Sequence, residues 1–508
     1  MFSLLFINCA GFYKKYQIGV LFFYFFLGLW LTLGNPFGIS VAADQALAKE
    51  ISRYRSILYP IERQPITVVL FNKKTLERLH EANVDWVFSN DWPISYDEHA
   101  TLIQALSQGG GHHFSYPPEA IFYDVFLENL RGEIQDIYGL NDAFRSIKVD
   151  QGPPVYMAAG GLKDLILSQD IYRELPEANW VPTAWEGPEG SYPLYKEFLL
   201  PDGRGGDQPH FTRLPATQLY DAWCRVQKSG VCVPLETNQG ENALSIQWER
   251  QVLPASLSNP TSSPANLALE RNTDPLVLDC QSSTFSLLLK TIGSTFWRAL
   301  GIQSNPAQLD MNCLPFYVVN AADIYTTHIP LAPPYLAEGE PYVVLFGSDI
   351  PSLNDFHSTP NYGKIAGVLH HAMALVNLMD RQNSYIYEKE IRLMVAAMWG
   401  FWLWSVWILS SRLFCLERGW ILILIQRSEH YLSKENFVVI HFLRYKLVRQ
   451  LVWFIFYLSV ILIFYAFFYH FLNAALEGWL SMIALIPLLP NIVKIRKEHI
   501  LILSKERK

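Results

Sequence analysis

Four apolar blocks constrain this 508-residue chain more than any other feature of its sequence. A helix of about 20 apolar residues crosses a bilayer core, and each block approaches or reaches that length. A buried helix of a soluble protein explains one such block, but not three in succession that are rich in Trp, Phe and Tyr. The blocks are residues 18–33, 393–409, 451–472 and 474–493. We therefore predict an all-α transmembrane part of four helices.

Charge is divided between the flanks of these blocks and the long segment that they enclose. Residues 44–390 carry 24 Lys and Arg against 41 Asp and Glu, a net charge of −17, whereas the other residues carry 16 against 6. Lys and Arg gather in cytoplasmic loops, and here they gather at Lys14 and Lys15, in residues 411–450 and in residues 494–508. We predict that both termini are cytoplasmic, with the acidic segment outside a bacterial inner membrane.

The sequence leaves the fate of the first block open. Residues 40–44, SVAAD, resemble a signal-peptide cleavage site, so a cleaved signal competes with a retained anchor. Both alternatives place the following segment outside. The predicted organisation is a cytoplasmic stub with the first anchor or signal at 1–43, an exterior domain at 44–390, a transmembrane helix at 391–410, a basic connector at 411–450, two transmembrane helices at 451–493 and a basic tail at 494–508.

The exterior segment alternates short apolar runs with helical patterns. Residues 66–71, 120–126 and 155–159 have the length and composition of buried strands. Helical spacing follows the first run, and Ser95 is placed to cap a second helix. This alternation predicts a layered α/β domain with a largely parallel sheet.

The middle of the exterior segment is less regular. Residues 160–312 contain Pro- and Ser-rich stretches, which predict long loop insertions, with strands near 195–200 and 211–214 and a helix at 283–300. Further on, residues 366–379 have the pattern of an amphipathic helix that runs almost directly into the block at 393–409.

Four cysteines fall in the exterior segment, where oxidising conditions favour disulfides. Cys224 and Cys232 flank a Ser-Gly turn, which suggests a hairpin clip and leaves Cys280 with Cys313. Four cysteines allow three connectivities, so the other pairings stay open.

Motifs for catalysis, metals and phosphates are missing from the sequence. It has no GxxxxGK[ST], HExxH or GxSxG pattern and no CxxC pair with zinc spacing. We expect no enzymatic activity, no catalytic residues, no metal site, no cofactor and no nucleic-acid binding.

Asp124 is the most informative polar residue, because a carboxylate in an apolar strand is costly unless it is paired or hydrogen-bonded. A structural hydrogen bond is the simpler explanation. The functional alternative places Asp124 at a strand end that faces a crevice, where α/β sheets bind ligands. Asp355 and Asn354 follow a later strand and are expected to lie near it.

Ordered pieces of the exterior segment resemble the second class of CHASE domains, which are extracellular sensor modules of bacterial receptors. The pieces are ITVVLFN at 66–72, Trp92-Pro93, AIFYDVF at 120–126, LNDAF at 140–144, NAADIY at 320–325, the run at 342–360 and His371-Ala372. The resemblance covers roughly residues 43–381. The family also typically has one span before the sensor and three after it.

The resemblance implies candidate ligand-binding positions at Asn72, Trp92 and His371, beside Asp124 and Asp355. Asn72 departs from the family, which usually has an acidic residue at the end of the first strand. The arginine expected after the Trp-Pro turn is replaced by the region of Ser95 and Tyr96. Such sensors generally precede a cytoplasmic output enzyme, whereas about fifteen residues follow the last predicted span here.

These features predict a membrane sensor or receptor subunit whose exterior domain binds a small molecule or an envelope protein. A separate signalling or envelope protein would supply the output. The apolar runs of the 411–450 connector either pack at the membrane surface, which is the simpler explanation, or dock that partner. The alternative is a structural subunit of an envelope assembly that uses the exterior domain as an interaction platform. The sequence is also compatible with a homo-oligomer.

Overall fold

The computed structural model describes one compact unit, Lys49–Glu388, in detail. Within it the described residues are 49–388 except 51, 83–91, 111–115, 128–129, 132, 161–168, 185–189, 202–206, 228–231, 236–242, 252–276, 280–281, 300–306 and 351–354. Elsewhere, only positions 26, 30, 400, 474 and 475 are described. The four predicted spans, the connector and the tail therefore lie almost wholly outside the described residues. None of the helices in the described part is long and apolar enough to cross a bilayer.

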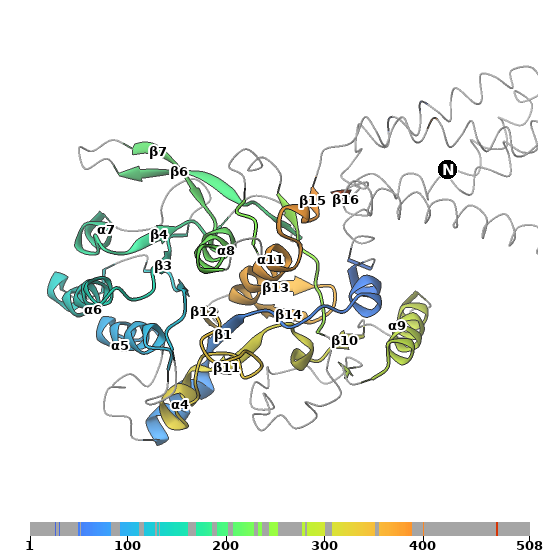
Figure 1. The fold of residues 1–508 in the computed structure, drawn as a ribbon, viewed down its shortest axis with the longest axis horizontal. Coiled ribbons are helices and arrows are strands. Elements are labelled where there is room, and N and C mark those ends of the chain that lie inside the picture. Colours follow the sequence, from blue (N-terminus) through green and yellow to red (C-terminus); the bar gives the residue numbers. More distant parts are fainter. Residues whose placement is uncertain are drawn as a thin grey trace, which may run out of the picture. The chain divides into compact units, whose positions relative to one another are not determined.

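A six-stranded parallel sheet forms the centre of this unit (Figure 1). Its strands, in spatial order, are β11 (Tyr317–Asn320), β1 (Ile66–Phe71), β12 (Val343–Ser348), β2 (Ala120–Asp124), β3 (Val155–Ala158) and β4 (Asn179–Val181). Every residue of β1, β2 and β12 is buried, as expected for parallel strands that helices cover on both faces. The predicted layered α/β fold with a largely parallel sheet is confirmed.

Helices cover the sheet on both faces and create two separate cores. Alternate strand residues divide between them, so that Val68 points into one core and Val69 into the other. The first core includes α8 (Pro215–Val226) and α11 (Gly367–Arg381). The second includes α4 (Lys73–Glu81), α5 (Tyr96–Ser107), α6 (Tyr138–Val149), α7 (Gln169–Glu174) and α10 (Ala321–Thr326). Ser95 caps α5 as predicted, in a reciprocal capping box with Glu98.

Smaller elements surround this centre. The strands predicted near 195–200 and 211–214 are β6 (Tyr195–Pro201) and β7 (Asp207–Arg213), which pair antiparallel. The predicted helix at 283–300 is α9 (Thr284–Ala299). The remaining elements are β5 (Ser191–Tyr192), β8 (Leu244–Ser245), β9 (Val277–Leu278), β10 (Gln308–Leu309), β13 (Phe356–Thr359), β14 (Gly363–Ala366) and β15 (Tyr387–Glu388), with single-turn helices η2 (Ile134–Ile137), η5 (Met311–Cys313) and η7 (Gln382–Ser384). The two-residue strand β16 (Ala474–Ala475) belongs to the other unit.

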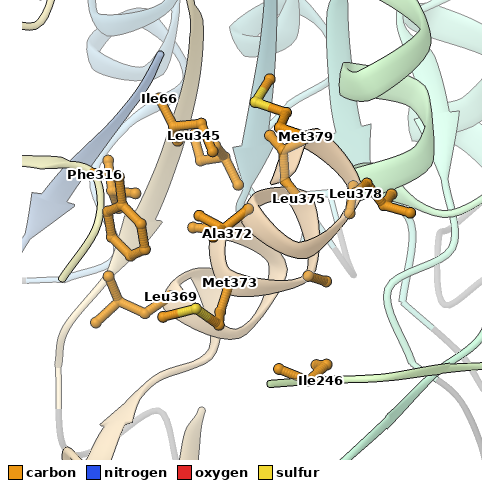
Figure 2. Close-up of a cluster of buried hydrophobic side chains, with 14 of the residues drawn as sticks. Ile66, Ile246, Phe316, Leu345, Leu369, Ala372, Met373, Leu375, Leu378 and Met379 are labelled. Carbon is orange, nitrogen blue, oxygen red and sulfur yellow. The ribbon is translucent and has the colours of Figure 1, made fainter. Parts of the chain in front are cut away.

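Helix α11 is buried on every side, which corrects the prediction of an amphipathic helix. Gly367 to Met379 are all buried, and Figure 2 shows their side chains meeting residues of the sheet on one side and Ile246 on another. The polar positions that suggested a solvent-facing stripe have partners inside the protein. Asn377 accepts a hydrogen bond from the backbone N–H of Gln247 at 2.6 Å and donates one to its carbonyl at 3.0 Å.

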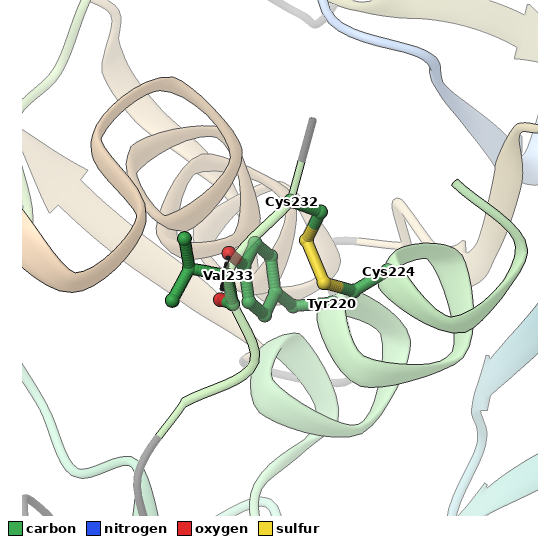
Figure 3. The surroundings of a disulfide bond; sticks show 4 residues. All are labelled: Tyr220, Cys224, Cys232 and Val233. Carbon is green, nitrogen blue, oxygen red and sulfur yellow. Dashed lines mark hydrogen bonds between the residues drawn. A yellow bond between two sulfur atoms is a disulfide. The ribbon is translucent and has the colours of Figure 1, made fainter. Parts of the chain in front are cut away.

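The disulfide between Cys224 and Cys232 is present (Figure 3). Cys224 lies in the last turn of α8 rather than on a hairpin strand, so the bond joins the helix end to the segment that follows it. The Tyr220 hydroxyl, one turn earlier in α8, donates a hydrogen bond to the Val233 carbonyl at 2.8 Å. Cys280 lies outside the described residues and Cys313 is buried, so their pairing stays a prediction.

A glycine allows α11 to approach the sheet closely. Added at Gly347 in β12, a Cβ atom would lie 2.5 Å from the Cβ of Val368 in the first turn of α11. We expect Gly347→Ala to lower the free energy of unfolding by about 1–3 kcal/mol, because the helix must move away from the strand. Thermal or denaturant unfolding of the full chain in detergent measures this loss.

Gly293 in α9 provides the matched control, because no atom lies within 4 Å of its added Cβ. Gly293→Ala should be neutral or stabilising by up to about 1 kcal/mol, through helix propensity. Equal stability of the two variants would contradict the close approach of α11 to β12.

Candidate functional site

The end of strand β2 brings Asp124 to the carboxyl edge of the sheet. Asp124 is the last residue of β2 and pairs in register with Gly347 of β12. Since Gly347 contacts Val368, Asp124 lies near the beginning of α11. Asp124 therefore lies at a strand end, as the functional alternative requires, and the crevice that this alternative also requires stays a prediction.

Asp355 lies at the first residue of α11. A Cβ atom added to Gly367 would collide with both carboxylate oxygens of Asp355. The backbone N–H of Gly367 donates a hydrogen bond to the Asp355 carbonyl at 2.9 Å, and its donation to the carboxylate favours the ionised form. A carboxylate at this position also interacts favourably with the helix dipole.

The two carboxyl groups are close enough to influence each other's ionisation. Burial raises the pKa of Asp124 well above its usual value, and the charge of Asp355 raises it further. Burial also raises the pKa of Asp355, while His357 and the Gly367 N–H oppose that rise. These opposing contributions favour a protonated Asp124 beside an ionised Asp355.

His371 is buried beneath this pair, on the inner side of α11. Its ring meets Phe122 of β2 edge-on at a centroid distance of 5.2 Å. The Tyr192 hydroxyl accepts a hydrogen bond from the Ala216 N–H at 3.1 Å and lies 2.9 Å from His371 Nδ1. The hydroxyl can donate its proton to Nδ1 when the imidazole hydrogen is on Nε2. Burial lowers the pKa of His371 to about 3, so the ring is neutral.

Two further histidines connect the pair to the surface. His357 Nε2 lies 3.9 Å from Asp355 Oδ1, and the two side chains are 38% and 37% exposed. The His357 ring lies 4.9 Å, centroid to centroid, from that of His370, which is buried in α11. Burial lowers the pKa of His370 well below its usual value. Asp355 and His357 are therefore the partly exposed members of this group.

Asn72 and Trp92 do not join this group. Asn72 caps α4, accepting a hydrogen bond from the Thr75 N–H at 3.0 Å, and lies 3.4 Å from the Asn320 side-chain amide. Trp92 contacts Phe71 and His99. Both Phe71 and His99 belong to the opposite side of the sheet from α11. Three of the five predicted residues, Asp124, Asp355 and His371, are thus brought together.

The group combines a buried carboxyl, Asp124, with the partly exposed carboxyl of Asp355 and with the neutral imidazole of His371. A second negative charge on Asp124 would be costly beside Asp355, so a proton or an organic cation that neutralises the pair would be favoured. Among the described residues, no three His, Cys, Asp or Glu side chains are arranged to hold a metal ion.

A family model for the CHASE2 domain matches residues 20–416. The chain belongs to the CHASE2 domain family. CHASE2 domains are extracellular sensory domains, so the acid pair at the start of α11 lies in a sensory module. No curated protein and no solved structure matches the chain.

Sequence reasoning missed three polar residues of this CHASE2 domain. Tyr192 lies in a two-residue strand with no recognisable pattern, and its contact with His371 spans 179 positions of the chain. His357 and Asp349 follow β12 in a stretch where the sequence pointed to Asp355 and Asn354, and Asn354 lies outside the described residues. Burial raises the pKa of Asp349 to about 6. The cluster of polar residues after a buried strand was the available signal, because parallel strands place such residues at one edge.

Ionisation of Asp124 should make the stability of the CHASE2 domain depend on pH. The folded protein holds a proton on Asp124 that the unfolded chain releases near pH 4, so this residue's contribution to the free energy of unfolding falls as pH rises above about 4. Asp124→Asn removes that loss. We expect the melting temperature of the variant minus that of the wild type to become more positive between pH 4.5 and pH 8.

Asp142 on α6 is the matched control, because its side chain is 73% exposed. Asp142→Asn should give a difference from wild type that is constant over the same pH range. A constant difference for Asp124→Asn as well would show that burial of Asp124 does not disfavour its charge.

Proposed function

We propose that this chain is a multi-pass sensor subunit of a bacterial inner membrane. Its CHASE2 domain lies outside the membrane, binds a small molecule or an envelope protein, and passes the signal to a separate partner. The chain performs no catalysis of its own. The proposal rests on the position of α11 in the chain. The helix begins at the acid pair and ends at Arg381, and only residues 382–392 separate it from the apolar block at 393–409.

The burial of α11 supports transmission along its length. A helix held on all sides by packed side chains moves as one body rather than bending locally, because protein interiors are close-packed. A change of charge at Asp355 acts on the first turn of that body. Any shift of the helix would then reach Arg381 at its last residue.

The C-terminal end of α11 is linked to the helix that follows the first predicted span. Arg381 lies 3.7 Å from the Glu249 carboxylate, which also pairs with Arg55 at 2.9 Å. Arg55 belongs to the helix at residues 52–58, which follows the first predicted span. Glu249 is buried, and burial raises its pKa to about 7, against the opposing effect of Arg55. The two membrane-proximal ends of the domain are therefore linked through one carboxylate.

The partner is proposed to dock on the basic connector at 411–450, whose apolar runs offer a contact surface on the cytoplasmic side. A ligand shifts such a receptor only if it binds one of its two states more tightly. We propose that α11 has two positions, which differ in their contact with Asp355. A ligand at the acid pair would bind one of these positions more tightly than the other.

Asp355→Asn tests the coupling. Removing the charge weakens the interaction with the first turn of α11 by about 0.3–1 kcal/mol. In the full chain in nanodiscs, we expect hydrogen exchange to change at residues 378–388 as well as at 363–370. Exchange measured by mass spectrometry on the variant and the wild type at one pH gives the answer.

Asp142→Asn again serves as the control and should leave both regions unchanged. If Asp355→Asn alters exchange only at 363–370, a local structural role explains Asp355 and the proposed route through α11 is wrong.

A further inference from the structure

A second polar site lies on the face of the sheet opposite α11. A cavity of about 320 Å³ opens between the start of α5, the segment after β2 and the turn η2 that precedes α6. Its polar lining consists of Ser95, Tyr96, Asp97, His99, Arg131 and Asp136. This volume is at the lower end of the range of small-molecule sites, which run from about 300 to 1,000 Å³. It suits a small metabolite rather than a nucleotide or a peptide.

Buried side chains fix the inner wall of the cavity. Ile94 and Leu127 line it and are 4% and 5% exposed. His99 is buried, and its Nδ1 lies 2.7 Å from the Tyr123 hydroxyl. Burial and, secondarily, the charge of Arg131 lower the pKa of His99 to about 3, so the ring is neutral. The wall therefore offers an apolar surface and an uncharged imidazole.

Arg131 is held at the cavity by its backbone. Its N–H donates a hydrogen bond to the Tyr96 hydroxyl at 3.1 Å. Tyr96 is itself buried in the first turn of α5. In the described part of the chain, the Arg131 guanidinium takes part in no ion pair. Its planar fork is consequently available to a carboxylate in the cavity.

Two carboxylates face the same space from other elements. Asp97 comes from the first turn of α5 and, within the described residues, forms no ion pair. Asp136 accepts a hydrogen bond from the Glu133 N–H at 2.8 Å through one oxygen, which leaves the other available. Positive and negative groups thus line one cavity without neutralising each other.

We propose that this cavity binds a small zwitterion of the α-amino acid class. Arg131 receives the ligand carboxylate, Asp97 and Asp136 receive its ammonium group, and Ile94 and Leu127 contact its side chain. A simple anion is excluded because the two carboxylates would repel it. A simple cation is disfavoured because the guanidinium would repel it. The site is distinct from the acid pair at α11, so the proposal goes beyond the proposed function and does not depend on the route through α11.

Direct binding tests the proposal. Each of the twenty free L-amino acids is titrated by calorimetry into the full chain in nanodiscs. We expect at least one to bind, and Arg131→Ala to weaken its binding about 10- to 100-fold, since a hydrogen-bonded charge contact is lost. Asp97→Asn combined with Asp136→Asn should weaken binding similarly.

Analogues that carry only one charge show whether the site requires both the ammonium group and the carboxylate of its ligand. For L-leucine, 4-methylpentanoate lacks the ammonium group and 3-methylbutylamine lacks the carboxylate; equivalent pairs serve for another bound amino acid. Both analogues should bind at least 10-fold more weakly than the amino acid.

Arg145→Ala is the control, because Arg145 is exposed on α6 and does not line the cavity. It should leave binding unchanged. The melting temperature without ligand shows whether each variant folds, and Arg131→Lys, which keeps the charge but loses the fork, should bind with intermediate strength. Failure of all twenty amino acids to bind, equal binding of a single-charge analogue, or full binding by a folded Arg131→Ala protein would each overturn the proposal. None of these results depends on whether α11 transmits a signal.

Discussion

The packing of α11 against the parallel sheet is the interaction on which the rest of the domain depends. The helix contributes nine apolar side chains to the larger core and contacts β1, β12 and α8. Its first turn approaches β12 so closely that only glycine fits at position 347. Because the helix has no solvent-facing side between Gly367 and Met379, its polar residues must find partners inside the protein. Those partners include Tyr192 for His371 and Gln247 for Asn377.

This burial places unusual chemistry at both ends of one helix. At the start, Asp124 and Asp355 lie where ionising both carboxyl groups is unfavourable. At the end, Arg381 meets the buried Glu249, which also holds Arg55. Each arrangement costs free energy unless local contacts compensate it, and such sites are commonly functional. Under the proposed function, a signal would enter at the first arrangement and leave at the second.

Much of the fold could be predicted from the sequence, because short β-branched runs and cap residues are local signals. The strand at 66–71, the strand predicted at 155–159 and observed at Val155–Ala158, and the cap at Ser95 follow from such signals. The burial of α11 was not, because its histidines and Asn377 look like a polar face until their distant partners are known. In the candidate site, Asp124 and Asp355 were predicted to be neighbours from their places after two strands. Tyr192 and His357 were missed, since only the tertiary structure brings them to α11.

The claim that α11 is a rigid link between the acid pair and Arg381 is tested most directly by native-state hydrogen exchange. Amides that open only in global unfolding report the full stability of a domain, whereas locally opening segments report less. In the full chain in nanodiscs, the amides of residues 371–381 should exchange with the same opening free energy as those of β1 and β12. A clearly lower value for α11 than for these strands would contradict the account, because a helix that opens by itself cannot carry a displacement from one end to the other.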